Sequence, residues 1–358
     1  MDESARESRS LLVSNPFGAE HRSRLIVQWF EASGPPTPSD AWKHIYRLLL
    51  WIDATTGLAH CYESDKSQPG RRWYPRSLAF HAWASEALGV TPIALGGEID
   101  WMFQQAIEAL TRSIEAQRQQ LLDTFRMQCA PYEGKGFPEP GDNPELVAIL
   151  TEALEPFLQV MPLADVWRTI TQRIRTHLSQ ENKRKNLVGE GFEDVLAALI
   201  SRLPGDLQIE AHTRKLLHEI PGFRPPRGKQ KPKKVDVVVQ RGADHARILI
   251  TSKWSIRADR EEQFATDYGA YVELETAGEP FTYVLVTNEF DPARLLAACD
   301  RLAGNQWLLT EVVHVNPQAL LAAYGEKPWK SAREVIARIQ QGRLLSLEAW
   351  LLKLVAGG

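Results

Sequence analysis

A series of short apolar runs in the second half of this 358-residue chain most constrains what it can fold into. Most of the runs are rich in valine, isoleucine or aromatic residues, which favour strands, and they lie at 206–211, 234–240, 247–253, 281–290 and 307–316. Helical patterns separate or follow them at 187–203, 260–271, 292–303 and 331–355. Strands that alternate with helices predict an α/β fold with a mixed central sheet flanked by helices.

The first half of the chain differs, because its apolar residues follow a helical period and no alternating strand pattern competes. Helices are predicted at 24–32, 40–52, 78–88, 98–127 and 145–177. The Pro- and Gly-rich stretch 131–144 predicts a linker or long surface loop, and the polar stretch 179–186 predicts a second junction. We therefore expect a mostly helical N-terminal domain over residues 1–180, followed by the α/β domain over 181–358.

Composition limits the class of protein. Hydrophobic residues make up 44% of the chain and charged residues 24%, an ordinary balance for a globular protein with a sizeable core. Three scattered cysteines cannot form a disulfide framework or a four-cysteine zinc site, which fits a reducing cytoplasm. The first residues carry charges where a signal peptide needs an apolar core, and no apolar run approaches the roughly 18 residues of a membrane span. We expect a cytoplasmic protein without a membrane partner.

The net charge of −3 hides a strongly basic segment. Between residues 211 and 260 the chain has thirteen Lys and Arg against four Asp and Glu. Five of these cations lie in a Pro-broken loop just before the second predicted strand: Arg227, Lys229, Lys231, Lys233 and Lys234. Such a loop is suited to the phosphates of a nucleic-acid backbone, which give affinity without sequence information. The alternative is a solvated loop without a partner.

A second basic cluster follows a Pro-Gly turn in the helical half. Arg71, Arg72 and Arg76 surround Trp73 and Tyr74. Arginine beside aromatic rings can hold a backbone phosphate while the rings stack on a base or sugar. Alternatively, the two aromatic side chains pack on the core while the arginines face water.

Two charges interrupt the apolar strands. Asp236 lies between valines, and Lys253 ends the next run, seventeen residues later. A salt bridge between neighbouring strands would explain both residues. However, an exposed ion pair stabilises a protein by only roughly 0 to 1 kcal/mol, which is less than the free energy needed to desolvate two charges. We therefore interpret the pair as part of a reactive site.

Together with Glu193 on the preceding predicted helix, Asp236 and Lys253 form a pattern that resembles the PD-(D/E)xK nuclease superfamily. The resemblance implies that a helix and two strands meet at one site. It implies further that the acids hold Mg²⁺ beside the scissile phosphate, and that the lysine steadies the attacking water.

The residues after the lysine narrow the resemblance. Thr251, Ser252 and Lys253 are followed by an Arg-x-Asp-Arg element, and Asp267 stands fourteen residues after the lysine. This order resembles the type II restriction endonucleases that read a CCGG or CC-N-GG core, in which the second acid comes from the following helix. In that group serine usually stands at the position of Thr251 and glutamate at that of Asp267. Glu262 or Glu273 would take the role of Asp267 if the helix register differs.

The resemblance covers residues 186–315 and implies a set of site residues. Asp236, Asp267 and the Ser252 carbonyl are expected to bind Mg²⁺, since this hard cation prefers a few oxygen ligands. Arg257, Asp259 and Arg260 are expected to read bases, because arginine pairs with guanine O6 and N7 and aspartate accepts from cytosine N4. An alternative role for Asp259 is to cap the helix that follows.

We therefore expect a Mg²⁺-dependent type II site-specific deoxyribonuclease that cuts double-stranded DNA at a short palindrome with a CCGG-like core. A two-fold site calls for a two-fold protein, hence a homodimer, or dimers paired into a tetramer. The N-terminal domain would contact DNA, build the dimer, or both. The alternatives are a structure-specific repair or recombination nuclease of the same superfamily, and a catalytically inactive DNA-binding protein.

Overall fold

The computed structural model describes residues 15–136, 143–204, 209–228, 231–242, 247–257 and 261–356. Contacts divide the chain into two compact units. One consists of Ala106–Leu187 with the chain up to Phe17, and the other of Gly18–Gln105 and Val188–Gly358. This division differs from the boundary expected near residue 180, because residues 18–105 belong with the sheet.

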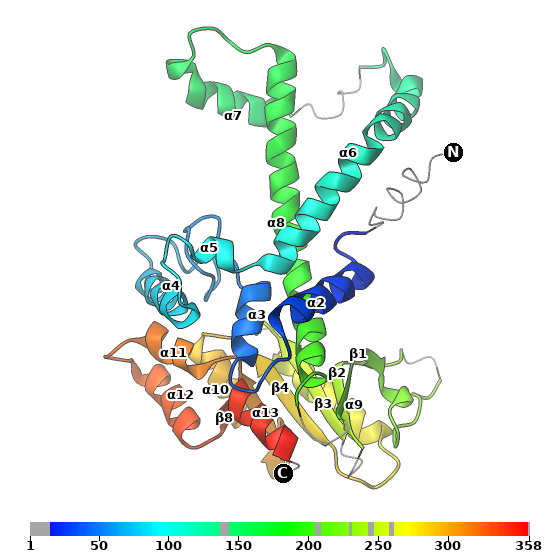
Figure 1. Ribbon diagram of the computed structural model, residues 1–358, viewed down its shortest axis with the longest axis vertical. Coiled ribbons are helices and arrows are strands. Elements are labelled where there is room, and N and C mark those ends of the chain that lie inside the picture. The colour runs from blue at the N-terminus through cyan, green and yellow to red at the C-terminus, as the bar shows by residue number, and fades with distance from the viewer. Residues whose placement is uncertain are drawn as a thin grey trace. The chain divides into compact units, whose positions relative to one another are not determined.

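A six-stranded mixed sheet forms the centre of the second unit, in the order β1-β2-β3-β4-β7-β8 (Figure 1). The first three strands pair antiparallel, and β3, β4, β7 and β8 are parallel. The predicted α/β class with a mixed central sheet is thus confirmed. The strands are β1 Ile209–Leu216, β2 Lys234–Arg241, β3 Arg247–Lys253, β4 Thr282–Thr287, β7 Glu311–His314 and β8 Leu344–Ser346.

The central strands form because their apolar residues are buried on both faces. Val237 to Val239, Leu249, Ile250 and Val284 to Val286 are fully buried. A strand covered on both sides has no reason to alternate polar and apolar residues, which is why these strands appear in the sequence as unbroken apolar runs. The charged residues at the ends of such strands are therefore exceptions that need an explanation.

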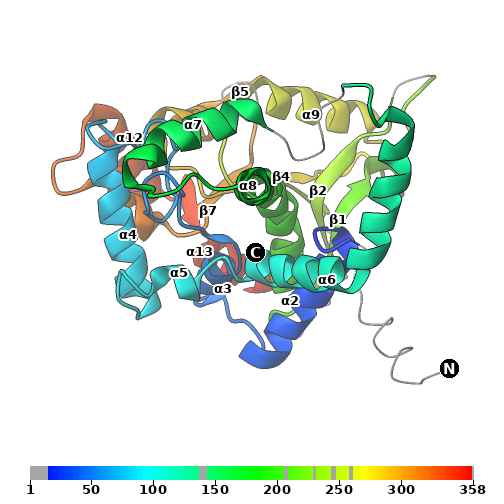
Figure 2. The ribbon, with the colours of Figure 1, turned by 90° about the horizontal axis from the view of Figure 1, so that it is seen from above.

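Helices cover the sheet. In Figure 2, α9 lies on one side of the strands and the α2–α3 pair on the other. On the α9 side, Tyr271 packs edge-on against Tyr283 of β4, with ring centroids 5.4 Å apart. The helices of this unit before the strands are α2 Ala19–Ser33, α3 Ala41–Leu49, α4 Tyr74–Leu88 and the one-turn α5 Leu95–Glu98. Those after β3 are α9 Glu261–Leu274, α10 Pro292–Asp300, α11 Pro317–Tyr324, α12 Lys330–Gln340 and α13 Leu347–Ala356.

Aromatic contacts join residues 18–105 to the sheet. The Phe80 and Phe290 rings lie 4.9 Å apart, and the Tyr46 and Trp254 rings 6.4 Å apart. The buried Tyr46 hydroxyl also donates to Asn288 Oδ1 at 2.8 Å. Buried aromatic pairs of this kind stabilise beyond the area that they cover. They are the physical reason why these helices do not form part of a separate N-terminal domain.

The first unit is built from helices alone in its described part. They are α6 Trp101–Cys129 from Ala106 onwards, α7 Pro144–Leu154, and α8 Ala164–Ile200 as far as Leu187, with single 3₁₀ turns at Ala130–Tyr132 and Glu155–Phe157. The last part of α8, from Val188 to Ile200, belongs to the second unit. The helix α8 runs straight through 179–186, where a junction was expected. That stretch is polar but contains no Gly or Pro, and an ion pair of 2.6 Å joins Arg184 to Glu181 one turn earlier. Polar residues with good helix propensity extend a helix rather than end it.

Further boundaries differ from the sequence prediction. The helix expected over 145–177 is divided in two, since α7 ends at Leu154 and α8 begins at Ala164. The helix expected to reach residue 303 ends at Asp300, where Leu302–Ala303 (β5) pairs with Gln306–Trp307 (β6) in a small hairpin. Helix α11 was not predicted at all. It is capped by Asn316, whose side chain accepts from Gln318 N. The single C-terminal helix expected over 331–355 is divided by Gly342, which has a positive φ of 67°, and by strand β8.

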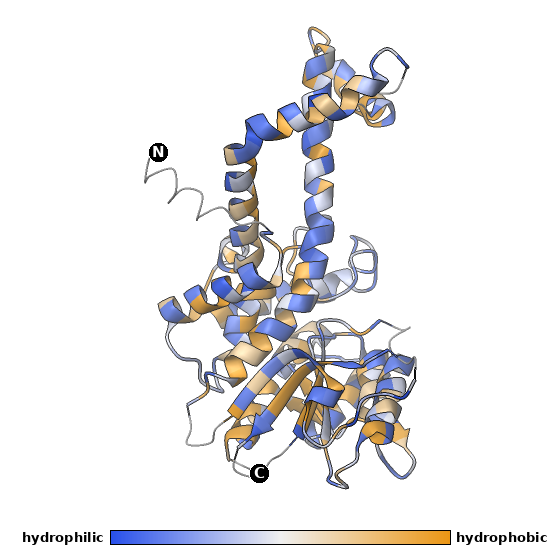
Figure 3. Cartoon of the chain, turned by 90° about the vertical axis from the view of Figure 1, so that its right-hand side faces the viewer, coloured by the Kyte–Doolittle hydropathy of each residue, from blue (hydrophilic) through white to orange (hydrophobic). Residues whose placement is uncertain are grey.

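The first unit exposes many apolar side chains. Of the 21 exposed large hydrophobic residues in the described part of the chain, 14 lie between 106 and 187, among them Leu121, Phe125 and Leu163. Figure 3 shows hydrophobic residues along α6, α7 and α8. Within the described residues, no helix is long and apolar enough to cross a membrane.

Candidate active site

Asp236 accepts three hydrogen bonds from β3 on one of its carboxylate oxygens. The antiparallel pair Val237–Ile250 places Asp236 beside Thr251. Its Oδ2 accepts from Thr251 Oγ1 at 3.2 Å, from Ser252 N at 3.0 Å and from Lys253 Nζ at 2.5 Å. The structure thus brings together the four residues that the sequence placed at the ends of two neighbouring strands.

The other oxygen of the Asp236 carboxylate, Oδ1, differs from Oδ2 in its hydrogen bonding. Within the described residues, Asp236 Oδ1 accepts no hydrogen bond. The Asp236 side chain is 25% exposed and that of Lys253 is 20% exposed, so solvent and a ligand can reach both. The N–H and C=O of one strand residue leave the strand on the same side. The Ser252 carbonyl therefore faces the same edge as its N–H, towards Asp236.

Glu193 lies on α8 close enough to sense both members of the pair. Burial, with the negative charge of Asp236 as the next cause, raises the pKa of Glu193 to about 7, although Arg214 and Lys253 act in the opposite direction. Its side chain is 13% exposed. A carboxylate with a pKa near neutrality beside a second carboxylate is typical of functional sites.

Arg214 holds Glu193 and is a residue that sequence reasoning missed. Its guanidinium donates to Glu193 Oε2 at 2.8 Å and pairs with Asp194. In the β1–β2 register Arg214 lies opposite Asp236, between the pairs Thr213–Val237 and Lys215–Val235. Its φ of 51° is left-handed, which costs a non-glycine residue roughly 1–2 kcal/mol and is commonest near functional sites. Nothing in the sequence marks this backbone strain.

Asp267 is the acid of α9 that faces the site. It is 16% exposed and its Oδ1 accepts from Lys233 Nζ at 2.9 Å. Burial raises the pKa of Tyr271 one turn away, and the charges of Asp267 and then Asp236 raise it further, so both carboxylates act on the same hydroxyl. Glu262 and Glu273 are exposed. The helix register therefore favours Asp267 over these two alternatives.

The oxygen donors at this end of the sheet suit a hard divalent cation in kind. Mg²⁺ is commonly held by one or two carboxylates, with water and substrate phosphate completing its shell. Asp236, Asp267 and the Ser252 carbonyl provide that set. Within the described ranges, no three His, Cys, Asp or Glu side chains are grouped so as to hold a metal ion by themselves.

The expected base-reading element begins immediately after this cluster. Arg257 is exposed and follows the turn at the end of β3. Asp259 and Arg260 lie outside the described residues, as does the helix-capping role considered for Asp259. The turn itself is well fixed, since Ile256 N donates to Glu289 Oε2 at 2.6 Å and Asn288 N donates to Trp254 O at 3.1 Å.

The cations of the basic loop before β2 fall into two groups: one binds a carboxylate, and the others are exposed. Lys233 binds Asp267, so it belongs to the carboxylate cluster as much as to any phosphate surface. Arg227, Lys231 and Lys234 are exposed. Lys229 lies outside the described residues.

The second basic cluster is largely a packing arrangement. The Arg76 guanidinium lies 4.1 Å from the Trp73 ring centroid and 3.4 Å from that of Trp329, and Trp73 also packs on Tyr62. Arg71 and Arg72 are exposed. This geometry fits the alternative in which Trp73 packs internally, and it leaves Arg71 and Arg72 as the residues accessible to a phosphate.

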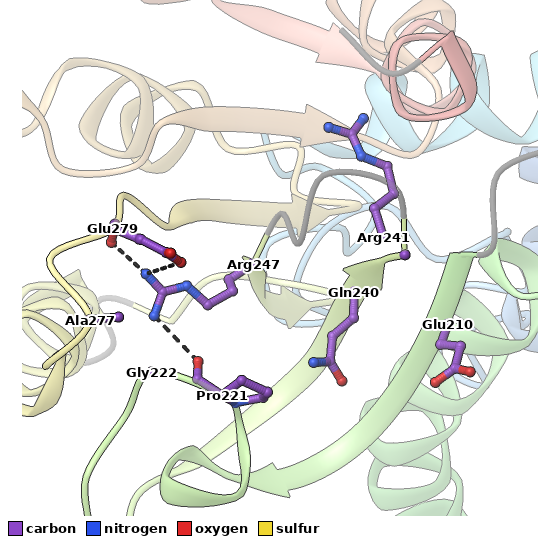
Figure 4. Close-up of a pocket in the computed structure, with 9 residues that line it drawn as sticks. Glu210, Pro221, Gly222, Gln240, Arg241, Arg247, Ala277 and Glu279 are labelled. Carbon is purple, nitrogen blue, oxygen red and sulfur yellow. Dashed lines mark hydrogen bonds and ion pairs between the residues drawn. The ribbon is translucent and has the colours of Figure 1, made fainter.

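A cavity of about 470 Å³ lies at the opposite end of β2 and β3 (Figure 4). Gln240, Arg241 and Arg247 line it together with Gly222 and Glu279. Because Asp236 and Lys253 are at the other ends of the same strands, this cavity is separate from the carboxylate cluster.

No known protein family matches the chain, and a search of curated proteins finds no significantly similar sequence. The function must therefore be inferred from the residues of the site.

Proposed function

We propose that the protein is a Mg²⁺-dependent type II site-specific deoxyribonuclease that cuts both strands of DNA at a short palindrome with a CCGG-like core. The observation that carries the proposal is the convergence of Lys253, Thr251 and Ser252 on Asp236. Glu193 and Asp267 lie on the two helices beside this pair and supply further carboxylates.

The charge balance of the cluster supports a reactive role. Asp236 and Glu193 are both partly buried and close enough for one charge to raise the pKa of the other carboxyl. Like charges in a partly desolvated site are unfavourable unless a cation compensates them. A structural ion pair would need only Asp236 and Lys253, whereas here two further carboxylates, Glu193 and Asp267, are present, each with its own cation.

The proposed chemistry is phosphodiester hydrolysis. Mg²⁺, held by Asp236, Asp267 and the Ser252 carbonyl, would lower the pKa of a bound water and neutralise charge on the phosphate. Lys253, whose ammonium lies at this carboxylate, would hold the attacking water and stabilise the negative charge that develops on the phosphate oxygens. Thr251 would keep Asp236 oriented through its hydroxyl. The P–O bond to the leaving strand breaks as the new P–O bond forms.

DNA recognition would use the segment that follows Lys253. Arg257, Asp259 and Arg260 suit the guanine and cytosine edges of a CCGG-like core in the major groove. The exposed cations before β2, with Arg71 and Arg72, would bind backbone phosphates, so affinity should fall steeply with salt. A restriction enzyme of this kind works on cytoplasmic DNA.

A homodimer is part of the proposal, because a palindrome presents the same half-site twice. The 14 exposed apolar residues of the first unit support self-association, and the ten Lys and Arg between 106 and 187 nearly balance the eleven Asp and Glu there. Sedimentation velocity should give a dimer or tetramer. A Leu121→Glu, Phe125→Glu double variant should dissociate it, and Val272→Glu on the exposed face of α9 should not.

The test of the function is incubation of plasmid DNA with the purified protein and Mg²⁺ at 50–200 mM salt. Wild-type protein should give discrete fragments, as should Lys215→Ala, a control whose lysine binds Gln240 instead of the cluster. Lys253→Ala should give none. Absence of fragments at every salt concentration, or unchanged cutting by Lys253→Ala, would overturn the proposal. Cutting of branched DNA alone would indicate a structure-specific nuclease, and binding without cleavage a DNA-binding protein.

A further inference from the structure

The strand β4 ends beside β3, and the two segments that follow them leave the sheet together. The parallel pairing runs to Lys253 opposite Thr287. Immediately beyond, Asn288 N donates to Trp254 O at 3.1 Å. The residues after β4 are therefore the nearest support for the residues after Lys253.

Glu289 is the second residue beyond β4, and its carboxylate links two short segments. Its Oε2 accepts from Ile256 N at 2.6 Å. Its Oε1 accepts from Phe290 N at 2.9 Å and from Asp291 N at 2.8 Å. It thereby joins the turn after β3 to the residue that caps α10.

This carboxylate is 4% exposed, so its burial has to be offset. Hydrogen bonds from backbone N–H groups to a charged oxygen are among the stronger ones in proteins. Arg294 adds a longer contact of 3.5 Å and is itself paired with Glu63 at 2.7 Å. Two of the three amides that this carboxylate accepts from belong to its own loop, and the third, Ile256 N, belongs to the turn after β3. Burying a carboxylate is costly unless its hydrogen bonds are made, so the bond to Ile256 N fixes the position of that turn.

The segment it holds is fixed on its other sides as well. Ile256 is fully buried, and Trp254 packs edge-on against Phe192 with ring centroids 5.5 Å apart. Arg257 is the next residue along the chain. The course of the chain up to Arg257, the first residue of the Arg-x-Asp-Arg element, is thus set at Ile256.

We infer that Glu289 is a positioning residue that holds the turn after β3, and with it Arg257, the first of the proposed base-reading residues, in register with Lys253. The inference rests on the proposed nuclease function, and it assigns to Glu289 the selectivity of that site rather than its chemistry. Glutamine at this position would keep the size of the side chain. Its amide NH₂ would replace one of the two acceptor oxygens, so either Ile256 N or the amides of Phe290 and Asp291 would lose a partner.

The test compares Glu289→Gln with Glu63→Gln, a control that removes the other partner of Arg294 without touching Ile256. Two quantities are measured: amide hydrogen exchange over residues 254–257 in the protein without DNA, and the ratio of kcat/KM for a cognate site to that for a site with one altered core base pair. Glu289→Gln should speed exchange in this segment at least tenfold while β3 and β4 keep their protection. It should also lower the selectivity ratio at least tenfold. Glu63→Gln should change neither.

A second variant covers the case in which the glutamine protein does not fold. Glu289→Asp keeps the charge but draws the carboxylate back by one methylene, and the same faster exchange and lower selectivity are expected. Unchanged exchange at 254–257, or faster exchange with unchanged selectivity in an active enzyme, would overturn the positioning role. If the wild-type protein cuts no DNA, it is the proposed function that fails, and the exchange data still decide whether Glu289 holds the turn.

Discussion

The two ends of β2 and β3 each carry a buried or half-buried cation, but the two cations are satisfied in different ways. At one end, Arg247 is 3% exposed on its side chain and donates to the Pro221 carbonyl at 3.3 Å and to Glu275 Oε1 at 3.0 Å (Figure 4 shows its surroundings). At the other end, Lys253 is 20% exposed and binds an aspartate that has a second, unused oxygen within the described residues.

We interpret the Arg247 end as stabilising and, in the proposed nuclease, the Lys253 end as reactive. The contacts of Arg247 connect two loops, one at Pro221 and one between α9 and β4. A side chain at Gly222 would collide with the Arg247 guanidinium, so the backbone there is fitted to it. The Lys253 end instead gathers Glu193, Asp236 and Asp267, and backbone strain at Arg214 is retained beside them. We expect changes at the Arg247 end to affect folding and changes at the Lys253 end to affect catalysis.

The largest effect is expected for Lys253→Ala. Loss of a group that positions the nucleophile and stabilises developing charge should reduce the single-turnover cleavage rate about 10³-fold or more. The free energy of unfolding, measured by urea denaturation, should change by less than about 2 kcal/mol, because Asp236 remains partly solvated and keeps two other donors. A tenfold or smaller loss of rate would place this lysine outside the chemistry.

Arg247→Met should have the opposite effects: a large loss of stability and little change in the cleavage rate. Removing the buried guanidinium takes a donor from the Pro221 and Glu279 carbonyls and leaves the Glu275 carboxylate with backbone N–H donors alone. The free energy of unfolding should fall by about 3 kcal/mol. The folded fraction should cleave DNA within about threefold of the wild-type rate. A large loss of rate in a fully folded Arg247→Met protein would remove the distinction between the two ends.

Asp267→Asn tests whether the acid on α9 belongs to the reactive end. The loss of one proposed metal ligand should lower the cleavage rate about 100-fold and raise the Mg²⁺ concentration needed for half-maximal activity. Asp267→Glu, which introduces the residue common in the resembling group, should stay close to wild type. A loss of rate in Asp267→Asn without any change in the Mg²⁺ requirement would contradict the role as metal ligand and leave Asp267 as the partner of Lys233.

The pKa of Glu193 predicts how stability depends on pH without Mg²⁺. Its folded pKa, raised from 4.5 to about 7, means that the folded protein retains a proton that the unfolded chain releases. Stability should therefore fall as pH rises from about 4.5 to 7, by about 3 kcal/mol from this group. Glu193→Gln should flatten the profile measured by urea denaturation in that window. An identical slope in both proteins would show that another group titrates there.

The central strands and the pair of Asp236 and Lys253 were predictable because the residues that indicate them are neighbours in the sequence. β2, β3 and β4 are apolar runs in the sequence, and a charge that interrupts such a run is visible there. Long-range packing was not predictable. The Tyr46–Trp254 contact, which joins residues more than two hundred positions apart, decides that the N-terminal helices belong with the sheet.

The missed parts of the site share a physical cause. Arg214 acts through a left-handed backbone and through contacts with α8, and Glu289 acts through backbone amides of a distant turn. Neither a left-handed backbone nor a hydrogen bond to a backbone amide produces a recognisable spacing of residues in the sequence. The expected junction at 179–186 failed for a local reason, since polarity alone does not stop a helix that has no Gly or Pro.

The central claim is that the Lys253 end of the sheet cuts DNA at a defined sequence. The most direct test is to sequence the ends of the fragments that the purified protein produces from genomic-length DNA with Mg²⁺. The account predicts that the ends on both strands fall at one fixed position within a palindrome that has a CCGG-like core. Ends scattered without a common sequence, or DNA left intact, would contradict it.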